Sequence, residues 1–138
     1  LRRGPSAWVV SSDGRVIRPA GLFVGPKLPR IWIPTGESVD VGAPVADAPA
    51  ARAVHALAMV RAAGFGRRIA AVRAADDELT FVLPQGPELR FGDASNLTLK
   101  LAVATRMLPL TVGTSGYLDV TVPTRPIAGG NPQVSSRG

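Results

Sequence analysis

The side chains that could carry out acid–base chemistry are few in this chain. His55 is the only histidine, so a Ser–His–Asp catalytic arrangement would have to be built on it. Asp76, Asp77 and Glu78 form one acidic cluster, and paired carboxylates can cleave glycosides or hold a hard cation. However, His55 lies within a predicted helix, and the acidic cluster lies where a predicted hairpin must turn, a place that Asp favours. We therefore interpret both as ordinary structural residues.

The sequence predicts no cofactor, no metal and no catalytic residue. The chain has no cysteine, and a single histidine is a weak basis for a zinc site. Residues 64–68 (GFGRR) begin like a dinucleotide-binding fingerprint, but they follow a predicted helix and precede a predicted strand. That order is the reverse of the strand–turn–helix order that points helix amides at phosphate.

The length of 138 residues is typical of one domain, and a hydrophobic content of 46% is enough to form a core. The formal net charge of +6 leaves a nucleic-acid-binding domain as an alternative function. The basic residues are nevertheless scattered in ones and twos, without basic–aromatic interleaving. A solvated basic surface is therefore the favoured interpretation.

No stretch of 18 apolar residues occurs, so no membrane span is expected within the sequence as given. The chain opens on Leu1-Arg2-Arg3 without a starting methionine, which indicates a cut inside a longer protein. An upstream membrane span or targeting segment is compatible with such a cut.

The front of the chain is predicted to form short strands. Residues 7–18 are typical of a β-hairpin, because apolar β-formers flank a turn at Asp13-Gly14. Residues 22–26 and 28–34 are short extended pieces broken by proline, which favours sheet edges or strand ends.

A loop over residues 34–48 and a helix from about Pro49 to Ala63 come next. Alanine content and apolar residues at three- and four-residue spacing favour the helix, and Gly64 is suited to end it. Period-two patterns then predict a three-stranded antiparallel meander over residues 69–74, 79–83 and 88–91.

A second helix is predicted from about Ala94 to Leu108, with Asp93 or Ser95 as its N-cap. The last strand is predicted over residues 116–122. The fold class is therefore α/β (α+β), with an antiparallel or mixed sheet and two helices on one face.

Several motifs occur in a fixed order along the chain. They are the hairpin at residues 8–17, Leu28-Pro29 followed by Gly36, residues 89–93 (LRFGD), a helix with Lys100-Leu101, and residues 117–126 (YLDVTVPTRP). Together they resemble the β domain of the FtsQ/DivIB family of bacterial cell-division proteins, over about residues 7 to 128. The V-P-x-R-P ending is similar to that of members from high-GC Gram-positive bacteria.

The resemblance implies a domain division and a location. Residues 1–6 would be a stub of the upstream POTRA region, residues 7–128 the β domain, and residues 129–138 a flexible tail. The full-length protein would be a single-pass protein of the cell membrane with this domain outside the membrane, and the fragment is expected to be monomeric.

The resemblance also implies a non-enzymatic scaffold of the divisome. Members bind FtsB-like and FtsL-like proteins (DivIC and FtsL), and the complex regulates septal peptidoglycan synthesis. A partner segment adds to the sheet at the last strands, where an edge strand offers unpaired amides and carbonyls.

Carried over by position, the docking residues are predicted to be Tyr117, Asp119, Val120, Val122, Thr124, Arg125 and Gly129. The alternative for Tyr117 and Val120 is that they simply close the core. Pro123 and Pro126 lack amide hydrogens, and in an extended strand one of them would face the partner and shorten the ladder.

Two other function classes remain open from the sequence. One is the basic nucleic-acid-binding domain. The other is a peptidoglycan-active enzyme built on Asp76, Asp77 and Glu78.

Overall fold

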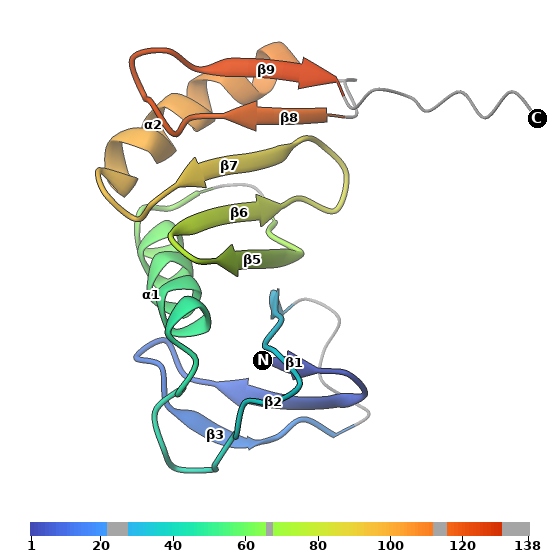
Figure 1. The fold of residues 1–138 in the computed structure, drawn as a ribbon. Helices are drawn as coiled ribbons and strands as arrows, with labels where there is room; N and C mark the ends of the chain where they lie inside the picture. Colours follow the sequence, from blue (N-terminus) through green and yellow to red (C-terminus); the bar gives the residue numbers. More distant parts are fainter. Residues whose placement is uncertain (22–27, 66–67, 112–115, 131–138) are drawn as a thin grey trace, which may run out of the picture.

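The computed structural model describes residues 1–21, 28–65, 68–111 and 116–130, and Figure 1 shows their arrangement. Within these residues a three-stranded sheet contains β1 (Arg2–Arg3), β2 (Ser6–Val10) and β3 (Val16–Pro19). A six-stranded sheet contains β4 (Arg30–Ile31), β5 (Ala71–Ala75), β6 (Glu78–Val82), β7 (Glu88–Gly92), β8 (Gly116–Asp119) and β9 (Ile127–Gly130). The helices are α1 (Ala48–Ala62) and α2 (Leu97–Met107), which continues as a 3₁₀ helix over Leu108–Thr111. The predicted α+β class is confirmed.

The predicted first hairpin is confirmed by the pairing of β2 with β3. Both strands run antiparallel, and Val9 lies opposite Arg18. Gly14 turns the chain with φ +85°, a conformation that glycine adopts without steric cost. The predicted extended piece at residues 28–34 contributes only β4, and residues 22–26 lie outside the described part of the chain.

Helix α1 has side-chain and backbone caps at its two ends. Asp47 is the N-cap and accepts a 2.8 Å hydrogen bond from the Ala50 amide. At the other end Gly64 has φ +72°, and its amide bonds the Arg61 carbonyl while the Phe65 amide bonds the Val60 carbonyl. These two bonds form a Schellman motif, so the predicted role of Gly64 as the helix stop is confirmed.

The predicted meander is confirmed as β5, β6 and β7, which pair antiparallel. Two parallel pairs extend it, β4 with β5 and β7 with β8, and α2 provides the crossover between β7 and β8. Both helices contact each other and lie along one side of the larger sheet (Figure 1).

The core lies between the larger sheet and the helices. Alternate residues on β6 and β7 point toward the helices and are buried, and the rings of Phe81 and Phe91 meet edge to face with centroids 4.9 Å apart. The intervening residues, among them Thr80, Glu88 and Arg90, form the open face of the sheet.

The start of α2 differs from the prediction. The helix begins at Leu97 rather than Ala94, and its N-cap is Asn96 in the left-handed conformation, with φ +49° and no side-chain capping bond. The prediction of Asp93 or Ser95 as the cap is therefore wrong. The Asp93 carboxylate instead accepts hydrogen bonds from Lys100 and from Ser95.

The end of the sheet also differs from the prediction. The strand expected over residues 116–122 ends at Asp119, and an additional strand, β9, returns antiparallel along β8. Pro123 and Pro126 lie in the connection between the two strands, where the Arg125 amide bonds the Val122 carbonyl at 2.9 Å. The argument that these prolines would interrupt an extended ladder is therefore wrong, because proline is well suited to such a turn.

The described residues contain no helix that is long and apolar enough to cross a membrane. The predicted domain boundaries stay a prediction. Arg2 and Arg3 pair with β2, and Gly129 and Gly130 belong to β9.

Candidate functional site

Strand β9 forms an outer edge of the larger sheet. The strands lie in the order β4-β5-β6-β7-β8-β9, and β9 pairs with β8 from Gly116–Gly130 to Asp119–Ile127. No strand from the described residues lies on its other side (Figure 1). In such an edge strand, alternate residues turn their N–H and C=O groups away from the neighbour. The arrangement can therefore accept another strand.

The structure separates the predicted docking residues into three groups. Tyr117 and Asp119 lie on β8 between two strands, and their half-buried side chains are on the open face of the sheet. Val120 is completely buried and its amide bonds the Arg90 carbonyl at 2.9 Å. The burial of Val120 favours the alternative that this residue closes the core.

The remaining predicted residues lie closer to the edge. Val122, Thr124 and Arg125 are exposed in the connection between β8 and β9. Gly129 lies on β9 itself, directly opposite Tyr117. These four residues, unlike Val120, are placed where a docked strand could reach them.

Sequence reasoning missed most of β9. Ile127 is 57% exposed, and Ala128 and Gly130 also belong to the edge strand. The available signal was a turn pattern, since Pro123 to Pro126 separates two short runs that could pair.

Exposed large apolar side chains are frequent in this C-terminal part. Four of them come from α2, the 3₁₀ helix, the β8–β9 connection and β9: Leu99 (53%), Leu110 (77%), Val122 (53%) and Ile127 (57%). Exposed apolar residues around a sheet edge are a common feature of protein-binding surfaces.

Tyr117 links β7, β8 and β9 on the open face. The Arg90 guanidinium carbon lies 3.9 Å from the centroid of the Tyr117 ring, a cation–π contact. On the other side, the Tyr117 ring covers Gly129, because a Cβ placed on Gly129 would lie 2.7 Å from its Cζ. The aromatic ring thus holds the glycine of the edge strand onto the sheet.

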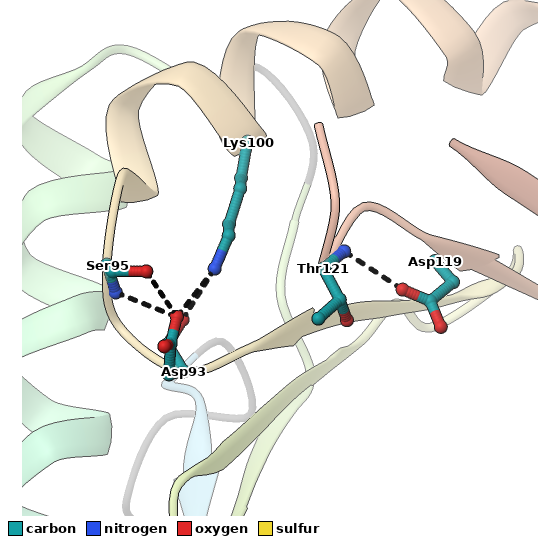
Figure 2. Close-up of polar contacts among 5 residues, drawn as sticks. All are labelled: Asp93, Ser95, Lys100, Asp119 and Thr121. Atoms are coloured by element: carbon teal, nitrogen blue, oxygen red, sulfur yellow. Dashed lines mark hydrogen bonds and ion pairs between the residues drawn. The ribbon is translucent and has the colours of Figure 1, made fainter. Parts of the chain in front are cut away.

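A buried lysine fixes the junction between β7 and α2 (Figure 2). Lys100 is 2% exposed and donates to Asp93 Oδ1 at 2.8 Å and to the Asp93 main-chain oxygen at 3.0 Å. The Lys100 hydrogen bond, followed by those from Ser95, lowers the pKa of Asp93 from 3.8 to about 2. The junction is therefore held by a charge-assisted contact.

The same junction contacts the start of the β8–β9 connection. Gly92 has φ +63°, and a Cβ at this position would lie 2.6 Å from Thr121 Cγ2. Asp119 Oδ1 accepts a 2.9 Å hydrogen bond from the Thr121 amide, as Figure 2 shows. These contacts determine where the chain leaves β8 and turns toward β9.

The residues first considered for chemistry are not brought together. His55 is exposed on α1, and Asp76, Asp77 and Glu78 are exposed at the β5–β6 turn. Asp76 has φ +47°, and Asp77 lies 3.7 Å from Arg52 in an exposed ion pair. Among the described residues, no group of three or more His, Cys, Asp or Glu side chains could hold a metal ion.

A groove of about 400 Å³ lies between the small sheet, β4 and α1. Its walls include the apolar residues Trp8, Val10, Val54 and Leu57. The described residues that line it include neither Asp, Glu nor His, so they supply no carboxylate or imidazole for acid–base chemistry.

The comparison with protein families agrees with the fold. The model of the family "Cell division protein FtsQ/DivIB, C-terminal" matches residues 2–121, which is most of the chain. No curated protein matches the chain. The chain therefore belongs to the FtsQ/DivIB family, whose members are non-catalytic, membrane-associated scaffolds with a role in cell division.

Proposed function

We propose that this domain binds FtsB-like and FtsL-like (DivIC and FtsL) proteins by accepting a partner strand at the outer edge of β9. In this way it would help to regulate septal peptidoglycan synthesis. The proposal includes an upstream single-pass membrane anchor and a location of this domain, as a monomer, outside the membrane.

The open edge of β9 is the observation that supports this proposal most. An added strand would satisfy the outward backbone groups of β9, while its alternate side chains would meet the two faces of the sheet. β9 is short and contains two glycines, which suits it to a partner segment of limited length. A long exposed edge strand would instead favour self-association.

The exposed apolar residues support docking at the same place. Val122 and Ile127 lie at the β8–β9 connection and at the start of β9, where a partner strand would remove them from water. Burying such side chains contributes roughly 25 cal/mol per Å² of apolar surface.

The experiment is a titration of the domain with a peptide from the membrane-proximal C-terminal region of an FtsB/DivIC-like protein, followed by amide NMR. We expect shifts concentrated at residues 116–130. A flat titration with a folded domain, or shifts confined to the small sheet, would contradict docking at β9.

A matched pair of variants makes the test specific. Val122→Asp places a charge at the proposed surface, whereas Val41→Asp places one at a similarly exposed valine in the loop before α1, since their exposed fractions are 53% and 56%. We expect only Val122→Asp to abolish peptide binding, with both variants folded. Equal losses in the two variants would indicate a nonspecific effect of charge.

A further inference from the structure

The Tyr117 side chain reaches across the edge strand. Tyr117 and Gly129 are direct partners in the β8–β9 register. A Cβ placed on Gly129 would lie 2.8 Å from the Tyr117 hydroxyl oxygen and 2.8 Å from its Cε1. Because the hydroxyl is the end of the side chain, Tyr117 begins on β8 and ends above β9.

Because Gly129 has no side chain, no side-chain atom at position 129 covers this hydroxyl. Any other residue at position 129 would place a side chain between Tyr117 and a docked strand. Neighbouring strands lie about 4.8 Å apart, so a strand added to β9 would bring a side chain on this face next to the Tyr117 hydroxyl. Within the described part of the chain, the hydroxyl makes no hydrogen bond of its own.

The Arg90 side chain places a positive charge beside the Tyr117 side chain. Its guanidinium lies against the Tyr117 ring and makes no ion pair with a described residue. Two carboxylates flank this pair in the sheet register, because Glu88 lies opposite Tyr117 and Asp119 lies opposite Arg90. Glu88 is paired with Arg73, and Asp119 accepts the Thr121 amide. The Arg90 guanidinium is therefore a cation packed on the same ring that carries the hydroxyl, where it can attract an incoming carboxylate.

We propose that the Tyr117 hydroxyl donates a hydrogen bond to a carboxylate side chain, Asp or Glu, at the position of the docked strand that lies beside Gly129. This inference rests on the proposed docking at β9 and adds the chemical class of the residue that is recognised there. A hydroxyl–carboxylate bond is charge-assisted and so stronger than a neutral one. Gly129 then contributes to specificity, because the absence of a side chain at this position lets the Tyr117 hydroxyl reach a docked strand.

The test uses the same FtsB/DivIC-like peptide as probe, with each position of its docked segment replaced in turn by Glu, Gln and Leu. The binding constants of these peptides are measured with the unmodified domain and with Tyr117→Phe, which removes only the hydroxyl. We expect one position where Glu binds about tenfold better than Gln. This preference should fall to about twofold or less in Tyr117→Phe.

Arg90→Gln is the second variant. Removal of the guanidinium should reduce the same Glu preference, and thermal unfolding would verify that the domain is folded. Amide shifts at residues 127–130 without a Tyr117-dependent Glu position would overturn this inference while leaving the proposed docking intact. Absence of those shifts with every peptide would overturn both.

Discussion

Lys100 contacts Asp93 twice, through the carboxylate at 2.8 Å and through the main-chain oxygen at 3.0 Å. The two partners are in very different surroundings, since the Lys100 side chain is 2% exposed and the Asp93 side chain 59%. One ammonium group thus joins the first turn of α2 to the exposed residue that follows β7. This asymmetry leads to two predictions about stability.

The first prediction concerns pH. The pKa of Asp93 is about 2 in the folded domain, below its usual 3.8, mainly because of the Lys100 hydrogen bond. A lowered pKa means that ionised Asp93 stabilises the fold above about pH 4, and that this contribution is lost as the pH falls toward 2. The free energy of unfolding should therefore differ between the unmodified domain and Asp93→Asn at pH 5 to 7, and the difference should shrink below pH 4.

Urea unfolding at several pH values measures this difference. The other carboxyl groups are common to both proteins, so their contributions cancel in the comparison. A difference that stays constant down to pH 2, or grows as the pH falls, would be inconsistent with the contact in Figure 2.

The second prediction ranks two substitutions. Lys100→Met removes the buried ammonium and leaves an exposed carboxylate that water can solvate, so we expect a loss of about 1 kcal/mol. Asp93→Ala leaves a buried ammonium with only a main-chain acceptor, and we expect it to destabilise the domain more. Chemical denaturation of both variants at pH 7 tests the ranking, and the reverse order would contradict it.

The third prediction concerns the attachment of β9. A Cβ on Gly116 would lie 1.9 Å from the Gly129 carbonyl oxygen, so Gly116→Ala requires the two strands to separate. We expect faster hydrogen exchange at residues 127–130, with the Phe81 and Phe91 amides still protected. Gly36→Ala is the control, since open space surrounds that position and its exchange pattern should match that of the unmodified domain.

The fourth prediction concerns the acidic cluster at the β5–β6 turn. The substitutions Asp76→Asn, Asp77→Asn and Glu78→Gln remove the three charges, and Asn tolerates the left-handed conformation of residue 76. We expect the combined variant to change the free energy of unfolding by about 0.5 kcal/mol or less, because these residues are exposed. Its affinity for the peptide should also be unchanged, and a large loss of binding would point to a functional role for the turn.

Elements with strong local signals could be predicted from the sequence. The Asp13-Gly14 turn, the alanine-rich helix ending at Gly64 and the period-two meander each carry their information within a few residues. Their structures agree with the prediction because local preference and tertiary packing favour the same conformation.

The candidate docking edge could be predicted only in part. Residues 127–130 (IAGG) have little intrinsic preference for a strand, and they become one because β8 and the Tyr117 ring hold them. The start of α2 was missed for a similar reason, since the Asp93 side chain is engaged by Lys100, a partner seven residues away in the chain. Both cases depend on contacts between elements.

The order of strands in the larger sheet has a consequence for biosynthesis. From β4 to β9 the strands lie side by side in the order in which the chain is made. Each strand therefore emerges when the neighbour it must pair with already exists, and the sheet can grow in one direction as residues are added. The edge that we propose for docking is the last part to form, so a chain interrupted before residue 127 could not recruit a partner there.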